Sequence, residues 1–214
     1  MFHRIILLIT SFGLLCWGVL AQTPHTHQHG FTNAEEWSQV FDDPSRDKWQ
    51  KPHEVIQALN LKSDSIIADI GSGTGYFAIR LTHMVPQGTV YGVDFEPDMV
   101  KFLKDRTNKL NISNLVSLKS EKGSVQLPKK VDMALFVDVF HHIENRTAYL
   151  KKLRSSLNLN GRIAIIDFKK DSSLGPPKEE RISPDQVKSE FKNAGFTLVQ
   201  EFNFLPNQYF LIFQ

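Results

Sequence analysis

The stretch from Ile66 to Gly75, IIADIGSGTG, sets the architecture of this 214-residue chain. An apolar strand ends near an acid, Asp69, and glycine then occupies every second position. Residues without Cβ are needed where a backbone turns tightly and approaches a ligand closely. A helical run, Tyr76–Val85, follows at once. This order of strand, glycine-rich loop and helix predicts a loop that binds a nucleotide-type cofactor.

The spacing of the glycines indicates which nucleotide the loop binds. In the dinucleotide fingerprint G-x-G-x-x-G, a third glycine would fall where this chain has Tyr76. The pattern D-x-G-x-G-x-G instead resembles motif I of the class I S-adenosylmethionine (SAM) dependent methyltransferases. The resemblance implies that the cofactor is SAM and that the loop residues bind it, namely Asp69, Gly71, Ser72, Gly73 and Gly75. A competing enzyme class, the NAD(P)-dependent oxidoreductases, is disfavoured because the chain also lacks a Tyr-x-x-x-Lys pair.

A second short strand, Thr89–Asp94, also ends in an acid. Asp94 lies about 20 residues beyond the glycine loop, where Rossmann-like folds place the carboxylate that binds ribose hydroxyls. The alternative is that Asp69 and Asp94 only cap helices or turns. The segment after Asp94 resembles the family's helix start after strand two, which implies that Phe95 or Met99 packs on adenine.

Strands and helices alternate along the rest of the chain, which predicts an α/β, Rossmann-like, doubly wound sheet. The resemblance implies a seven-stranded, mostly parallel sheet with an antiparallel hairpin at its C-terminal edge. Val131–Val137 is a continuous apolar run, typical of a parallel strand buried on both faces. The other predicted elements are helices opening at Thr32 or Asn33 and covering Pro52–Leu59, Pro97–Leu110, Asn145–Leu157 (stopped by Asn160-Gly161) and Ser183–Ala194, strands over Val116–Lys119 and Arg162–Phe168, and a hairpin of Phe196–Phe204 with Gln208–Phe213.

The first residues predict export. Arg4 precedes an apolar run, Ile5–Leu20, that is short for a membrane span, and Ala21 offers a small residue to a signal peptidase. We therefore expect a signal peptide or N-terminal anchor in residues 1–21, a flexible leader in 22–32 and one domain in 33–214. The expected location is periplasmic or secreted. Membrane contact is expected only through the N-terminal segment, if it stays uncleaved.

The predicted leader contains alternating histidines, His25, His27 and His29. Such histidines are weak candidates for a copper, zinc or nickel site. The alternative is a solvated leader, because no carboxylate or thiol completes a site. The only cysteine is Cys16, so the mature chain would have none, which fits an oxidising compartment.

Residues at the carboxyl ends of the predicted strands are expected to carry the chemistry. The resemblance places the methionine part of SAM against the glycine loop and the end of strand four, where Asp138 lies. Glu121 stands where many relatives have an aspartate that binds adenine. His141 and His142 are candidate catalytic bases because histidine titrates near neutrality. The alternative is that one ring packs or caps the next helix.

Two further segments are expected to border the cofactor and the acceptor. The segment Phe41–Pro52 sits where the family often has an N-terminal lid, although its Trp49 is equally compatible with packing on the sheet edge. The long loop Lys170–Ile182 favours a substrate role. The candidate substrate residues are Asp167, Arg181 and Tyr209; for Arg181 the alternative is a surface pair with Glu179 or Glu180.

These observations favour a SAM-dependent methyltransferase that acts on a small-molecule acceptor. The formal net charge of +2 predicts no nucleic-acid partner. The alternative from another class is an exported, non-catalytic protein that binds SAM or a metal on the same fold. That alternative takes the histidine leader into account, and also the fact that SAM is made in the cytosol.

Overall fold

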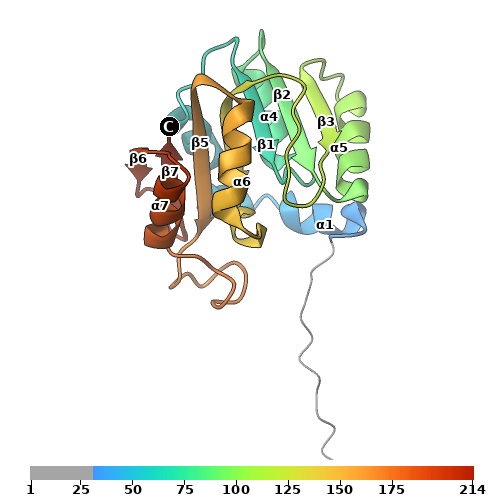
Figure 1. The fold of residues 1–214 in the computed structure, drawn as a ribbon. Coiled ribbons are helices and arrows are strands. Elements are labelled where there is room, and N and C mark those ends of the chain that lie inside the picture. The colour runs from blue at the N-terminus through green and yellow to red at the C-terminus, as the bar shows by residue number, and fades with distance from the viewer. Residues whose placement is uncertain (1–30) are drawn as a thin grey trace, which may run out of the picture.

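Seven strands form one open sheet in the order β3-β2-β1-β4-β5-β7-β6 in the computed structural model, which describes residues 31–214 (Figure 1). The strands are β1 (Ile66–Ile70), β2 (Thr89–Asp94), β3 (Leu115–Lys119), β4 (Val131–Val137), β5 (Leu157–Phe168), β6 (Leu198–Phe202) and β7 (Gln208–Phe213). The α-helices are α1 (Ala34–Phe41), α2 (Arg46–Gln50), α3 (Pro52–Ala58), α4 (Tyr76–Met84), α5 (Pro97–Lys109), α6 (Arg146–Leu153) and α7 (Pro184–Asn193). The predicted α/β class and the seven-stranded sheet are confirmed.

The direction of the chain across the sheet reverses between β1 and β4. β1 pairs in parallel with both β2 and β4, so the chain runs outward from β1 on one side and from β4 on the other. Open α/β sheets bind ligands at such a reversal, outside the carboxyl ends of the strands. The glycine loop leaves β1 there, and Asp138 follows β4 there. β7 is antiparallel to both β5 and β6, which confirms the predicted C-terminal hairpin.

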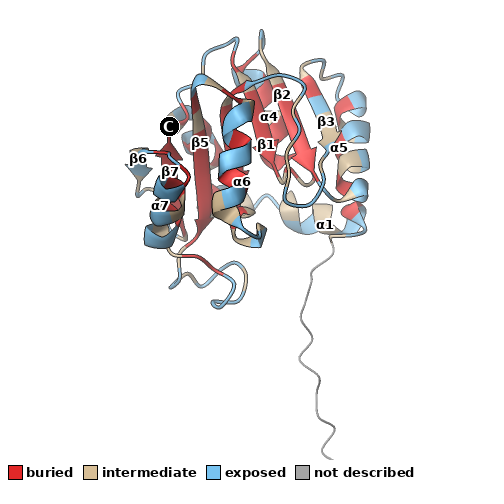
Figure 2. Cartoon of the chain, in the orientation of Figure 1, coloured by how far each residue is buried: buried red, intermediate tan, exposed pale blue. Residues whose placement is uncertain are grey.

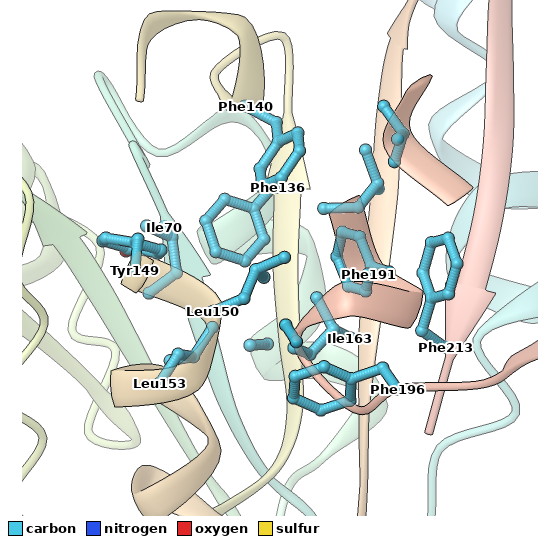
Figure 3. Close-up of a cluster of buried hydrophobic side chains, with 14 of the residues drawn as sticks. Ile70, Phe136, Phe140, Tyr149, Leu150, Leu153, Ile163, Phe191, Phe196 and Phe213 are labelled. Carbon is cyan, nitrogen blue, oxygen red and sulfur yellow. The ribbon is translucent and has the colours of Figure 1, made fainter. Parts of the chain in front are cut away.

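Apolar side chains cover both faces of the sheet. On one face, α3, α4 and α5 bury Leu81 and Leu103. On the other face, α6 and α7 enclose a cluster that includes Phe191 and Phe213, whose rings stack with centroids 3.8 Å apart (Figure 3). The central strands are buried along almost their whole length (Figure 2). This packing makes the sheet a firm support for the loops at its ends.

One predicted helix is wrong at its C-terminal end. α6 ends at Leu153, a 3₁₀ turn η2 (Arg154–Ser156) follows, and β5 already begins at Leu157. The predicted stop, Asn160-Gly161, lies inside β5, where the pairing with β4 shifts register. A Cβ on this glycine would lie 2.9 Å from Leu157 Cβ and 3.0 Å from the carbonyl oxygens of Asn158 and, across the strand pair, Val131. The glycine therefore serves a close approach between strands and not the end of a helix.

The order Ser183-Pro184-Asp185-Gln186 allows a capping box at the start of α7, and the structure forms half of it. Ser183 Oγ accepts a hydrogen bond of 3.2 Å from the backbone N–H of Gln186. The Gln186 side chain does not return to the cap and donates to Glu190 instead. The helix ends as predicted, with Gly195 in the left-handed region at φ +86°.

The first described helix lies at the carboxyl edge of the parallel strands, near the arrowheads of β1 and β2 in Figure 1. Asn33 occupies the N-cap position but its side chain makes no cap hydrogen bond. Its backbone N–H donates instead to Asp98 of α5, at 3.1 Å. The expected export segment 1–21 and the three leader histidines lie outside the described residues. Within residues 31–214, no helix is long and apolar enough to cross a membrane.

Candidate active site

The glycine loop is folded back on the end of β2. The backbone N–H groups of Gly71 and Ser72 both donate to the carbonyl of Val93, at 2.8 and 3.0 Å. Gly71 has φ +71°, and a Cβ there would lie 2.4 Å from a methyl group of Val139. At Gly73, with φ +52°, the nearest atom to such a Cβ would be Phe41 Cδ2, at 3.5 Å. Gly71 is thus required by packing, while Gly73 faces the N-terminal segment across the loop.

Asp94 holds this loop against the start of α5. One carboxylate oxygen accepts from Gly73 N at 2.8 Å and the other from Glu96 N at 3.0 Å. Burial raises the pKa of Asp94, and these backbone N–H groups oppose the rise. The predicted alternative, a carboxylate that organises a turn, therefore describes the structure. Each carboxylate oxygen keeps a second lone pair, so the same group retains acceptor capacity for a ribose hydroxyl.

Two hydroxyls of the loop are buried without a hydrogen-bond partner among residues 31–214. They belong to Ser72 and Thr74, which are 8% and 1% exposed. Buried polar groups in folded proteins are nearly always hydrogen-bonded, so each orphan needs an explanation. The two hydroxyls leave hydrogen-bonding capacity in the loop that no described residue uses. This observation fits the nucleoside cofactor that the sequence predicts.

Asp69 lies at the end of β1, beneath the loop, and is buried. Burial raises the pKa of this carboxyl to about 7, against the backbone N–H of Ala78 and the positive charge of Arg46. The nearby charge of Asp94 adds to the rise. Asp69 therefore exchanges its proton near neutrality, a property of groups found in functional sites and in buried networks alike.

Of the three residues predicted to contact adenine, Met99 is buried in the structure, at 1% exposed, while Phe95 and Glu121 are exposed. Phe95 is 41% exposed directly after β2. Glu121 is exposed in the turn after β3, and the preceding Ser120 N–H donates to the carbonyl of Asp94 at 2.8 Å. That bond brings the two strand ends together. The adenine contacts themselves stay predictions.

Asp138 follows β4 in the left-handed region, at φ +58°. Its backbone N–H donates to Ile166 of β5 at 2.9 Å. Its Oδ1 accepts from Gln208 Nε2 at 2.5 Å, and its Oδ2 lies 3.8 Å from Arg46 Nη2. Burial raises the pKa of Asp138, while Arg46 lowers it. Asp138 thus lies at the reversal point, as predicted, within a polar network.

That network was not predicted from the sequence. Gln50 Nε2 donates to Gln208 Oε1 at 2.7 Å, and both side chains are fully buried. Arg46 Nε and Nη2 each lie 3.3 Å from Gln50 Oε1, which closes a ring that returns to Asp138. The ring joins α2 to β7 and to the end of β4. Two glutamines 158 positions apart carry no local pattern that pairs them.

The rest of the predicted lid segment packs on the glycine loop and on the end of β5. The Trp49 ring lies 5.8 Å from that of Phe168, so packing on a strand end is confirmed for this side chain. Arg106 of α5 donates from Nη1 to both Asp42 and the Thr74 carbonyl, at 2.8 and 3.1 Å. The segment from α1 to α2 therefore covers the glycine loop.

His141 and Asp167 form a buried pair at the ends of β4 and β5. His141 Nδ1 lies 2.9 Å from both carboxylate oxygens, and the His141 backbone N–H donates to the same carboxylate at 3.2 Å. Phe168 N–H donates to it as well, at 2.8 Å. Burial alone would lower the pKa of His141, but the hydrogen bond and charge of Asp167, helped by Asp138, raise it. Asp167 therefore orients a histidine in this structure, a role that sequence analysis did not predict.

The second histidine borders an open pocket. The His142 ring lies 4.0 Å from that of His141 and 6.0 Å from Phe31. The pocket measures about 620 Å³, and its walls are His141 to Ala148, Lys151 and Glu190. The walls contain both positive and negative side chains. Among them, Arg146 donates two hydrogen bonds to Glu190, of 2.7 and 2.8 Å. A pocket with these walls suits a polar small molecule.

Arg181 is buried and bound to its own loop. Its Nε donates to Pro176 O at 2.8 Å, and its Nη1 lies 2.7 Å from Ser172 O, with two further carbonyls of the loop within 3.3 Å. The predicted alternative, a surface pair with Glu179 or Glu180, is wrong because the guanidinium caps backbone carbonyls. These contacts use Nε and Nη1 of a side chain that was expected to contact the substrate, and that role stays a prediction.

Tyr209 pairs with Asp167 across β7 and β5. Its hydroxyl is buried and has no hydrogen-bond partner among the described residues. Burial, reinforced by the charges of Asp167 and Asp138, raises the pKa of this phenol. The hydroxyl is therefore a neutral donor at the edge of the site. Within residues 31–214, no group of three or more His, Cys, Asp or Glu side chains is arranged to hold a metal ion.

Comparison with known proteins gives a consistent result. A family model described as a methyltransferase domain matches residues 61–206. A tRNA U34 carboxymethyltransferase of Campylobacter fetus is 34% identical over 111 residues, which are 50% of this chain and 37% of that protein. A malonyl-[acyl-carrier protein] O-methyltransferase of Acetivibrio thermocellus is 29% identical over 110 residues, 51% of this chain and 38% of that protein. The chain thus spans less than half the length of these two curated relatives.

A solved structure covers more of the chain. The crystal structure of a SAM-dependent methyltransferase from Aquifex aeolicus superposes with a TM-score of 0.79 at 29% identity. The match covers 85% of this chain and 97% of that one. The likeness therefore extends over both halves of the sheet and over the ends of its strands.

Proposed function

This chain belongs to the family of methyltransferase domains, and we propose that it transfers the methyl group of SAM to a small-molecule acceptor. The observation that carries the proposal is the glycine loop, in which the buried hydroxyls of Ser72 and Thr74 lack partners beside the carboxylate of Asp94. Loops of this kind at a sheet reversal bind nucleosides.

The residues that would hold SAM lie along the ends of β1, β2 and β4. The loop hydroxyls and backbone approach the ligand, Asp94 accepts from the ribose, and Asp69 and Asp138 face the methionine end. When bound, SAM supplies an electrophilic methyl group on a sulfonium that is already a good leaving group. The protein therefore has to position the acceptor, exclude water and remove a proton where needed.

His141 is the proposed base for the acceptor. Because Asp167 accepts from Nδ1, the proton of the neutral ring stays on that atom and Nε2 keeps its lone pair. His141 also lines the 620 Å³ pocket, whose volume lies within the range of small-molecule sites. An acceptor hydroxyl or amine in that pocket can give its proton to Nε2.

The proposed acceptor is a small polar molecule. One relative is named for a tRNA substrate and another for an acyl-carrier protein. A small polar acceptor is supported here by the mixed charges of the pocket and by the modest net charge of +2. The test is a transfer assay with SAM labelled on the methyl group, run in parallel with a small-metabolite extract, bulk tRNA and acyl-carrier protein. Label in the metabolite fraction alone supports the proposal, and label in tRNA contradicts it.

We also propose that the protein is exported, from the sequence of Arg4, Ile5–Leu20 and Ala21. N-terminal sequencing of the native protein is expected to begin near Gln22 for a cleaved signal. Recovery of intact Met1 in a soluble cytosolic fraction would contradict export.

The alternative function, a non-catalytic protein that binds SAM, predicts a different result in the transfer assay. SAM would bind to the protein, but no acceptor in the screen would be labelled.

A further inference from the structure

Arg46 is a partly buried cation whose ion pairing is incomplete. Its side chain is 14% exposed, and its nearest carboxylate oxygen, Asp138 Oδ2, lies 3.8 Å from Nη2. Hydrogen bonds between a guanidinium and a carboxylate are about 2.7–2.9 Å long. The bonds that Arg46 does make go to neutral acceptors, Phe41 O at 2.9 Å and Gln50 Oε1 at 3.3 Å. Removing a charge from most of its water is costly unless an opposite charge completes its surroundings.

The guanidinium lies beside the glycine loop. Its Cζ is 4.0 Å from the centre of the Tyr76 ring, and Tyr76 directly follows the last glycine of the loop. The Phe41 residue that accepts from Arg46 also faces Gly73. Arg46 therefore touches residues on both sides of the loop, at the end of the site where Asp69 and Asp138 lie.

We infer that Arg46 binds the carboxylate of the methionine part of SAM and so makes the site select an amino-acid-bearing nucleoside. The inference rests on the proposed function. SAM carries one anionic group, this carboxylate, and one guanidinium is its complement. Asp69 and Asp138 leave Arg46 free to accept a new partner, since burial raises the pKa of both carboxyls and weakens their negative charge near neutrality.

Binding of the SAM carboxylate to Arg46 would change only some of the contacts around this side chain. The 3.8 Å approach of Arg46 to Asp138 is replaced by direct hydrogen bonds to the ligand carboxylate. The bonds from Gln50 to Gln208 and from Gln208 to Asp138 need not break, because they use other atoms. The covering segment thus gains a contact with the ligand without losing its attachment to β7.

Calorimetry with two ligands tests this inference. SAM and decarboxylated SAM differ only at the carboxylate, and the full-length protein is titrated with each. The parent protein is expected to bind SAM about ten- to a hundredfold more tightly, the effect of a charge-assisted contact. Arg46→Gln is expected to bind both ligands within about twofold of each other. Arg80→Gln is the matched control, because Arg80 also lies 4.0 Å from the Tyr76 ring but pairs with Asp47.

The outcomes separate this inference from the proposed function. If Arg46→Gln keeps the ratio of the parent protein, the inference is overturned while SAM binding stands. If the parent protein binds neither ligand, both are overturned. Arg46→Lys covers the case in which the glutamine variant does not fold. Lysine keeps the charge but loses the planar fork, so an intermediate ratio is expected and an unchanged ratio contradicts the inference.

Discussion

The Nδ1 atom of His141 lies 2.9 Å from each carboxylate oxygen of Asp167, and the two side chains are only 3% and 1% exposed. This contact links the ends of β4 and β5, which are neighbours in the sheet. A carboxylate in this position fixes the tautomer and the orientation of the ring. The histidine proposed as the base therefore comes from the 3₁₀ turn after β4, and the carboxylate that orients it comes from β5.

Replacing Asp167 by asparagine is expected to lower turnover and to leave SAM affinity nearly intact. The amide nitrogen would face Nδ1 and shift the ring proton to Nε2, so that His141 no longer accepts a proton. Loss of a general base costs about a hundred- to ten-thousandfold. The check is kcat with an identified acceptor, together with calorimetric SAM binding. Asp171→Asn, at an exposed position on the following loop, is the control. Unchanged turnover in Asp167→Asn would exclude His141 as the base.

The raised pKa of Asp69 makes stability depend on pH in a defined direction. Its pKa of about 7 in the folded protein lies above the ordinary pKa of 3.8 for an aspartate. The folded protein therefore binds this proton more tightly, and the resulting stabilisation is present in acid and lost as pH rises from about 4 to about 7. Between about pH 4 and pH 7, the free energy of unfolding of Asp69→Asn is therefore expected to decrease by at least about 1 kcal/mol less than that of the parent protein.

Denaturant titrations at a series of pH values measure this effect. Asp64→Asn, an exposed carboxyl just before β1, is the matched control and is expected to keep the slope of the parent protein. An Asp69→Asn variant with the same pH slope as the parent protein would show that Asp69 titrates normally.

Alanine substitutions at Gly71 and Gly73 are expected to have different effects on stability and on SAM binding. A Cβ at Gly71 would lie 2.4 Å from Val139, so Gly71→Ala is expected to destabilise the fold by about 1–3 kcal/mol. At Gly73 the nearest atom would be 3.5 Å away, so the alanine variant costs only the strain of its positive φ, about 1 kcal/mol. Gly73→Ala is instead expected to weaken SAM binding. Equal losses of stability in the two variants would refute this distinction.

Asp94→Ala is expected to weaken SAM binding by about ten- to a hundredfold, because ribose hydroxyls lose a charged acceptor. The same variant loses the bonds to Gly73 N and Glu96 N, so its loop is also less ordered. Asp94→Asn helps to separate the loss of the charged acceptor from the loss of loop order. Its side chain is neutral, but its carbonyl oxygen keeps one of the two bonds to the loop. If Asp94→Ala folds and binds SAM like the parent protein, the ribose lies elsewhere.

Local chemistry explains which parts of the site were predictable from the sequence. The loop from Asp69 to Gly75 and the acid Asp94 follow strands directly, so their positions depend on a few neighbouring residues. The end of α6 was not predictable, because Gly161 serves a contact with β4 that only the sheet creates. Polar partners far apart in the chain, such as Gln50 with Gln208, leave no periodic signal.

The pair of His141 and Asp167 shows the same limit. Both residues were candidates on their own, but their contact depends on the register between β4 and β5. Arg181 shows a different limit: it was a candidate substrate residue by its place in a long loop, and in the structure its Nε and Nη1 donate to carbonyls of that loop. A charged side chain in a long loop can stabilise the loop itself.

The most direct test of the central claim is a calorimetric titration of the purified protein with SAM, with its demethylated product S-adenosylhomocysteine, and with NAD. The spacing of Gly71, Gly73 and Gly75 and the orphan hydroxyls of Ser72 and Thr74 predict that both sulfur nucleosides bind with one site per chain and that NAD does not bind. Binding of NAD in preference to SAM would contradict the account.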